Sequence, residues 1–212
     1  NIAGWPVGTA FPVAPQMSEI TLEVILRTVI GASDPVRLAA LREVMPRLLS
    51  VGPWETLAIA NPKLMARRPW RAVREAIAEA DRLLYAEIAD RRADPDLAQR
   101  TDALAMLIQA GDHGAAAVPD VAAGAAAPMT DRELRDQLMT LLVAGHDTTA
   151  TGLSWALERL TRHPAILAEA VRAAREGDDD YLDAVAKETL RIRPVVFDVG
   201  RILKEPVELA GY

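Results

Sequence analysis

The feature that most limits how this chain can fold is one long helix, predicted for residues 130 to 163. It begins with Thr130 as a capping residue and Glu133 three positions later, which is the pattern of a capping box. At 1.5 Å per residue, such a helix would be about 50 Å long. Apolar residues on both sides of its centre predict that it is largely buried. A long buried helix therefore dominates the predicted fold.

The centre of this helix is its most unusual part. The stretch LLVAGHDTTATGLSW, residues 141 to 155, puts Gly145, His146, Asp147 and two threonines where a buried helix is normally apolar. Mid-helix glycine costs about 0.5 to 1 kcal/mol relative to alanine, and threonine can bond the carbonyl four residues back. Both effects predict a loosened helix that can widen to admit water or a ligand. Ala144 and Thr148 would share a small flat face that suits a broad planar group, with Asp147 beside them to relay protons.

Helical periodicity recurs along most of the chain, with little of the alternation that indicates strands. Further helices are predicted at residues 18–31, 34–51, 71–92, 101–114, 164–177 and 178–194. Ser18 and Thr101 are expected caps, Gly31 is an expected stop, and Pro46 is an expected kink or break. Residues 60–70 are a predicted loop, and residues 113–129 a flexible connecting loop rich in small residues. The sequence therefore predicts an all-α, or mainly α, chain with short strands only in its tail, residues 195–212.

Composition excludes several classes of function. Half of the 212 residues are hydrophobic (50%), which is enough to bury a sizeable core. The net charge of −6 comes from intermixed acidic and basic residues, which argues against a nucleic-acid partner. No apolar run reaches the roughly 20 residues that a membrane-spanning helix needs. The count of zero cysteines excludes a disulfide framework, a thiolate nucleophile and any cysteine-bound metal within the chain.

A second motif lies about forty residues further along the chain. KETLRIRP, residues 187 to 194, holds Glu188 and Arg191 three positions apart, where they can form an ion pair. Taken alone, each motif has an ordinary explanation, as a core threonine bonded to its own helix or as a solvated surface pair. Both in this order, with ERLTRHPAILAEAVRAA between them and GRIL after them, resemble the cytochrome P450 family of haem-thiolate monooxygenases.

This resemblance implies roles for the residues of the first motif. Ala144 and Gly145 would leave room for the haem face and for dioxygen. Thr148 would hydrogen-bond dioxygen or its water, and Asp147 would deliver the protons that let water leave instead of hydrogen peroxide. His146 would not be an iron ligand, because a residue two positions from Ala144 and Thr148 points to another face. Replacing His146 with alanine is therefore expected to change little.

The second motif and the residues after it have implied roles as well. Glu188 and Arg191 would form a buried structural ion pair beside the haem. Arg201, in GRIL, would bind a haem propionate through its guanidinium group. The side chains expected to face the substrate are Val195, Val196 and Phe197.

The expected function is oxidation of a lipophilic small molecule with dioxygen and two electrons from a ferredoxin or reductase. Haem (iron protoporphyrin) is the implied cofactor, the cytoplasm is the expected location, and neither nucleic acid nor membrane is an expected partner. The family's cysteine ligand is absent, so residues 1–212 are expected to be one partial domain, either a truncated product or a piece of a longer enzyme, inactive by itself. The alternative is a non-enzymatic all-helical ligand-binding or interaction domain, which would lack the red-shifted Soret band of a reduced haem-thiolate carbonyl.

Overall fold

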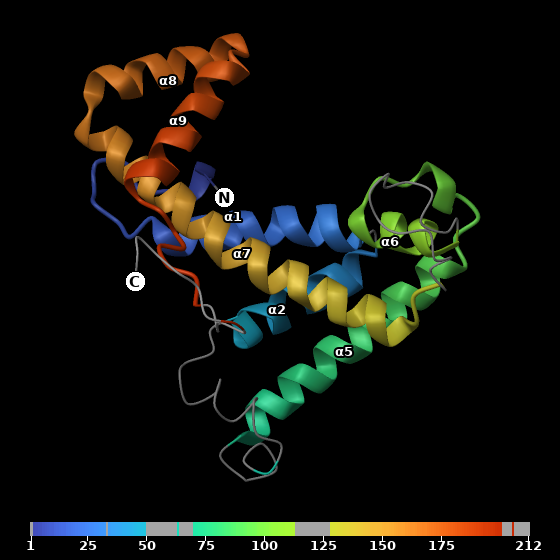
Figure 1. Ribbon diagram of the computed structural model, residues 1–212. Helices are drawn as coiled ribbons and strands as arrows, with labels where there is room; N and C mark the ends of the chain where they lie inside the picture. Colours follow the sequence, from blue (N-terminus) through green and yellow to red (C-terminus); the bar gives the residue numbers. More distant parts are fainter. Residues whose placement is uncertain are drawn as a thin grey trace. The chain divides into compact units, whose positions relative to one another are not determined.

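The computed structural model describes residues 2–32, 34–49, 63, 70–112, 128–200 and 205. They form two compact units, residues 1–150 and residues 151–212, and the division falls within one helix, α7 (Asp131–Arg162; Figure 1). The described residues contain helices and no strand, so the mainly α prediction is confirmed. Residues 195–200 are irregular. Most of residues 201–212, of the loop at 60–70 and of the connection at 113–129 lie outside the described residues, so their predicted structure stays a prediction.

The first unit is built from helices that the sequence largely predicts. They are η1 (Ile2–Gly4), α1 (Ala14–Ile25), which continues as the π-helix η2 (Leu26–Ile30), α2 (Pro35–Leu49), α5 (Arg71–Arg92), η4 (Leu97–Gln99) and α6 (Ala103–Asp112). Helix α2 packs against α5 (Figure 1). Among the residues described, no helix is both long and apolar enough to cross a membrane.

Three predicted helix ends differ from the structure. Helix α1 begins four residues before Ser18, because Pro15 fits its first turn, where no backbone donor is needed. Helix α2 does not break at Pro46 but continues to Leu49. Helix α6 is capped by Asp102 and not by Thr101, since an Asp102 carboxylate oxygen accepts the Ala105 N–H at 3.0 Å.

The core of the first unit is made of large aliphatic side chains from every long helix. The fully buried ones are Leu26, Ile30, Leu41, Met45, Leu84, Ile88, Leu104, Leu134, Leu138 and Leu142. Each contributes about 1.5 to 3 kcal/mol by leaving water. The last three belong to α7, so this core holds one face of the long helix.

Helix α7 begins with the predicted capping box. The Thr130 N–H donates to the Glu133 carboxylate at 2.8 Å, and the Glu133 N–H donates to the Thr130 hydroxyl at 3.3 Å.

A buried arginine joins three elements of the same unit. The Arg91 side chain, only 2% exposed, forms ion pairs with Glu87 at 3.0 Å and with Asp102. It also donates to the carbonyl oxygens of Ile30 at 3.1 Å and Gly31 at 3.0 Å. Gly31 ends the π-helix with a left-handed φ of 64°, and a β-carbon there would lie 2.4 Å from Cγ of Asp102. The network therefore fixes the end of η2 to α5 and to the start of α6.

The second unit contains the end of α7, then α8 (Pro164–Glu176) and α9 (Asp179–Ile192), which pack on each other as an antiparallel pair (Figure 1). Gly177 ends α8 with a φ of 75°, and Asp178 caps α9 by accepting the Tyr181 N–H at 3.1 Å. After α9, the Arg193 guanidinium lies 5.1 Å from the ring centre of Trp155 on α7. This cation–π contact holds the chain that follows α9 against α7.

Candidate functional site

The centre of α7 has one buried face and one open face. The buried side chains recur every four residues, at Leu134, Leu138, Leu142, His146 and Ala150. Ala144 and Thr148 are exposed, and each lies two positions from His146, which is a rotation of about 200° around an α-helix. The structure therefore brings Ala144 and Thr148 together on one face and puts His146 on the opposite one.

The helix is not loosened at its polar centre. It is α-helical without interruption from Asp131 to Arg162, although the Thr148 hydroxyl does donate to the Ala144 carbonyl at 2.6 Å. This side-chain bond leaves the backbone of α7 helical. The widened turn in this unit lies elsewhere, in η2. The expectation of a widened α7 is therefore wrong for this structure.

Gly145 allows two helices to pack closely. A β-carbon at this position would come within 2.6 Å of Cδ1 of Ile25, so the missing side chain lets α1 approach α7 closely. The family resemblance implies that Gly145 leaves room for a haem face and for dioxygen, and this role stays a prediction. In the structure, a Gly145 side chain would meet Ile25 of α1, while Ala144 and Thr148 lie on the open face.

His146 is tied to α1 by a buried hydrogen bond. Its Nδ1 lies 3.1 Å from Oγ1 of Thr21, and both residues are 5% exposed. Its Nε2 lies 3.7 Å from a carboxylate oxygen of Asp147. Burial lowers the pKa of His146, and the nearby Asp147 charge offsets this only in part, so the ring is neutral at pH 7. Thr21 is a site residue that the sequence analysis does not identify.

Asp147 lies between the two faces of α7. Its side chain is 61% exposed, and it is one position from buried His146 and one from exposed Thr148. It lines a pocket of about 370 Å³ together with residues of α1, α2 and α7, namely Pro15, Ser18, Glu19, Leu22, Pro46 and His146. The carboxylate thus has access to solvent from the side on which α1 packs.

The predicted ion pair of the second motif forms on α9. The guanidinium group of Arg191 donates two hydrogen bonds of 2.7 Å to the Glu188 carboxylate. This bonding lowers the pKa of Glu188. The side chains are 69% and 57% exposed, so the predicted burial is not found, because no described element of the second unit covers this part of α9. The pair is a surface pair in this chain.

The apolar residues after α9 are open to solvent. Val195 is half-buried beside Gly152, whereas Val196 is 63% and Phe197 84% exposed. A mainly apolar pocket of about 420 Å³ lies nearby among α7, α8 and α9, lined by Arg159, Leu160, His163, Ile166, Tyr181, Ala184, Val185, Glu188, Thr189 and Ile192. Arg201 lies outside the described residues.

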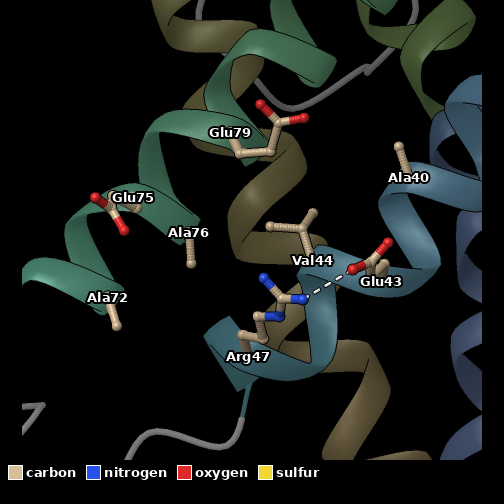
Figure 2. A pocket seen from close by; sticks show the side chains of 8 residues that line it. All are labelled: Ala40, Glu43, Val44, Arg47, Ala72, Glu75, Ala76 and Glu79. Atoms are coloured by element: carbon tan, nitrogen blue, oxygen red, sulfur yellow. Dashed lines mark hydrogen bonds and ion pairs between the residues drawn. The ribbon is translucent and has the colours of Figure 1, made fainter.

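A further pocket, of about 470 Å³, lies between α2 and α5. Figure 2 shows its lining, Ala40, Glu43, Val44, Arg47, Ala72, Glu75, Ala76 and Glu79. Each carboxylate already has an arginine partner on its own helix, at distances of 2.6 to 2.9 Å (Glu43 with Arg47, Glu75 with Arg71, Glu79 with Arg82). Within the described part of the chain, no group of acidic residues and histidines is arranged to hold a metal ion.

Known proteins of one family are similar to this chain over nearly its whole length. The family model for cytochrome P450 matches residues 7–212. "Putative cytochrome P450 135B1" of Mycobacterium tuberculosis is 72% identical over 218 residues, covering 100% of this chain and 44% of its own length. "Putative cytochrome P450 135A1" of the same species is 37% identical over 212 residues, with 45% of its length covered. The chain thus spans about half the length of these relatives.

Solved structures support the fold. The ligand-free structure of cytochrome P450 TbtJ1 superposes with a TM-score of 0.66 at 24% identity, covering 100% of this chain and 47% of that one. At this identity the likeness concerns the fold alone. It shows that the helices of this chain follow the arrangement of part of a known cytochrome P450 structure.

Proposed function

Because the chain belongs to the cytochrome P450 family, we propose that it forms the distal part of a haem-dependent monooxygenase, with the open face of α7 against the haem. The contrast between the two faces of α7 carries this proposal. His146 is buried on one face, while Ala144 and Thr148 are exposed on the other. A methyl group and a single hydroxyl make a surface flat enough for a planar macrocycle to lie on.

The residues present fit one side of a haem. Ala144 and Thr148 would contact the distal face, and Arg201 would bind a propionate. The thiolate ligand of the family is not supplied by these 212 residues, which include no cysteine. When bound, haem supplies the activation of dioxygen with two electrons from a ferredoxin or reductase.

The chain's own contribution is the control of protons. The Thr148 hydroxyl has one proton, which it donates to Ala144 O at 2.6 Å, so it can accept a second hydrogen bond or turn its proton toward the open face. Asp147 next to it is exposed and can take a proton from solvent. Together they would deliver protons to dioxygen so that water leaves instead of hydrogen peroxide.

The residues of the second unit would support this site. The Glu188–Arg191 pair would stabilise the structure beside the haem, and Val195, Val196 and Phe197 would face a lipophilic substrate. The exposure of Val196 and Phe197 supports this role, since large apolar side chains left in water often mark a binding surface. The absence of cysteine fits a reducing compartment, and the cytoplasm is the proposed location. By itself, the chain would be inactive.

The reduced carbonyl spectrum of the full-length enzyme tests the function. We expect the red-shifted Soret band of a haem-thiolate protein, and a full-length enzyme without it would overturn the proposal. Ala144→Leu should weaken carbonyl binding because its larger side chain fills the open face. Gln137→Leu is the matched control, since it is also exposed but lies about two turns earlier on α7. If Ala144→Leu binds carbon monoxide as wild type does, the open face of α7 is not the haem face.

A further inference from the structure

Residues 194–197, which follow α9, belong to no helix or strand. The backbone N–H of Arg193 donates to the Thr189 carbonyl at 2.8 Å and closes α9, and Arg193 itself has a non-helical backbone with φ −137° and ψ 69°. Pro194 cannot extend the helix, because proline has no N–H and disfavours the helical conformation at the residue before it. Contacts of side chains must therefore set the direction of the chain beyond α9.

The first of these contacts is made by Arg193. Its guanidinium carbon lies 5.1 Å from the ring centre of Trp155 on α7, within the range of a cation–π interaction, and tryptophan has the most favourable ring for it. The pKa of Glu158, one turn further along α7, is lowered mainly by a hydrogen bond from Arg162 and in part by the positive charge of Arg193. An aromatic face and a negative charge of α7 thus attract the same guanidinium group.

The second contact is made by Val195. A β-carbon built on Gly152 would lie 3.8 Å from Cγ2 of Val195, so Val195 lies over this glycine. Gly152 is three positions before Trp155, which places both on one face of α7, one turn apart. The chain after α9 therefore runs along α7 in the reverse direction, with Arg193 beside Trp155 and Val195 beside Gly152.

The next two side chains are the ones proposed to face the substrate. Val196 is 63% and Phe197 84% exposed, so these side chains are not held by burial. A side chain can shape a binding site only if the backbone that carries it is held in one place. The contacts of Arg193 and Val195 with α7, directly before Val196, provide such a hold.

We propose that Trp155 is a positioning residue, which holds Arg193 and thereby fixes residues 195–197 on α7, so that these residues form a defined wall for the alkyl part of a lipophilic substrate. The inference rests on the proposed function, because it concerns how the substrate-facing residues of that site are held. It gives Trp155 and Arg193 a role in substrate binding, although neither side chain contacts the substrate itself.

Four substitutions separate this role from a general one in stability. Trp155→Leu removes the aromatic face, whereas Trp155→Phe keeps one. Arg193→Met removes the charge but keeps an unbranched apolar side chain, whereas Arg193→Lys keeps the charge. If the two residues act through one contact, the double variant Trp155→Leu with Arg193→Met should be no more impaired than either single variant.

The test uses two probes that bind a haem iron through an imidazole nitrogen. They are imidazole itself and 1-dodecylimidazole, whose alkyl chain extends to the substrate side. Each is titrated into the haem-loaded, full-length enzyme and followed by the shift of the Soret band. Trp155→Leu and Arg193→Met should each lower the affinity for 1-dodecylimidazole by about 2- to 5-fold, which corresponds to the loss of an exposed cation–π contact. Their affinity for imidazole should stay at the wild-type value, and Trp155→Phe and Arg193→Lys should stay close to wild type with both probes.

The outcomes separate the inference from the proposed function. If the wild-type enzyme gives no Soret shift with imidazole, the proposed function fails. If it gives this shift, but Trp155→Leu binds 1-dodecylimidazole as the wild type does, the inference is wrong and the proposed function stands. Equal losses of affinity for both probes would also overturn the inference, because they would show general damage to the haem pocket.

Hydrogen exchange provides a second readout that needs no ligand. In the full-length enzyme, the amide protons of residues 195–200 should exchange about 2- to 5-fold faster in Trp155→Leu than in the wild type. Leu153→Ala is the control, since Leu153 is also exposed on α7 but lies about 200° around the helix from Trp155. The inference is wrong if both variants exchange equally fast, or if these amides are already unprotected in the wild type.

Discussion

Two paired arginines, one in each unit, lie in opposite surroundings. In the first unit, Arg91 is 2% exposed and binds two acidic residues and two carbonyl groups. In the second, Arg191 has a well-formed bidentate partner but is 69% exposed. An ion pair of good geometry is therefore no sign of burial. The buried network of Arg91 joins α5 to η2 and to the start of α6. The exposed pair of Arg191 and Glu188 lies within α9 and joins no other helix.

The largest difference should appear when a buried and an exposed cation are removed. In the full-length enzyme, Arg91→Met leaves the carboxylates of Glu87 and Asp102 buried with one partner fewer, which should cost about 3 to 5 kcal/mol of unfolding free energy. Lys187→Met is the matched control, since Lys187 lies on α9, is 76% exposed and pairs with Asp183 of the same helix, and it should leave the urea midpoint nearly unchanged. Equal losses of stability for both variants, measured by circular dichroism in urea, would break the comparison.

The second test compares two glycines that end helices with similar left-handed backbones. Gly31 has a φ of 64° and Gly177 a φ of 75°, but only at Gly31 would a β-carbon meet another atom, Asp102 Cγ at 2.4 Å. Alanine at either position should cost about 1 to 2 kcal/mol for its backbone, and Gly31→Ala a further 1 to 3, roughly, for overpacking. Thermal unfolding of the two variants checks this order. A loss at Gly177 as large as that at Gly31 would contradict the crowding at the buried network.

The third test uses the two glycines inside α7, one in each unit. Gly152→Ala makes only ordinary contacts, 3.7 Å from Leu190 and 3.8 Å from Val195, and should gain about 0.5 to 1 kcal/mol from helix propensity. Gly145→Ala would lie 2.6 Å from the flexible end of Ile25, so the strain should cancel this gain and leave a loss of about 1 kcal/mol. Urea midpoints should move in opposite directions. A gain at both positions would show that α1 does not pack closely on α7.

The smallest effect concerns a partly exposed pair between α1 and α2. Hydrogen bonds from Arg42 at 2.6 and 2.7 Å lower the pKa of Glu23 from 4.5 to about 2. Because folding lowers the pKa of Glu23, its ionised carboxylate stabilises the fold above pH 4.5. This stabilisation is lost as the pH falls through about 2. Glu23→Gln should therefore cost less than about 1 kcal/mol at pH 6, and this cost should shrink as the pH falls through about 2. Glu43→Gln is the control, since its partner Arg47 lies on the same helix. A constant difference between wild type and Glu23→Gln across this pH range would contradict the assignment.

Much of the fold was predictable because its signals are local. The Thr130–Glu133 capping box and the stop at Gly31 depend on neighbouring residues alone, and both are confirmed. The start of α1 and the cap of α6 differ from the prediction because Pro15 and Asp102 compete with Ser18 and Thr101 for the same roles. A local sequence pattern cannot choose between two candidate helix starts, because the packing of the helix decides which one is used.

The site was predictable only on its open side. The shared face of Ala144 and Thr148 follows from helical spacing, which needs no tertiary information. The partners on the other side were not predictable, because Thr21 lies 125 residues away from His146 and Gly145 meets Ile25 across two helices. On α1 the apolar Val24 is 54% exposed, whereas the polar Thr21 is buried. A buried threonine opposite a buried histidine is a signal that only the packed structure shows.

The most direct test of the central claim compares two neighbouring threonines of α7 in the full-length enzyme. Both Thr148 and Thr149 are exposed, but they point about 100° apart, and only Thr148 lies on the proposed haem face. Each alanine variant should keep its stability within about 0.5 kcal/mol, as surface substitutions usually do. The measurement is hydrogen peroxide formed per product at equal NADPH consumption. We predict that this ratio rises for Thr148→Ala and stays at the wild-type value for Thr149→Ala. A rise for Thr149→Ala with an unchanged Thr148→Ala would show that another face of α7 meets the haem.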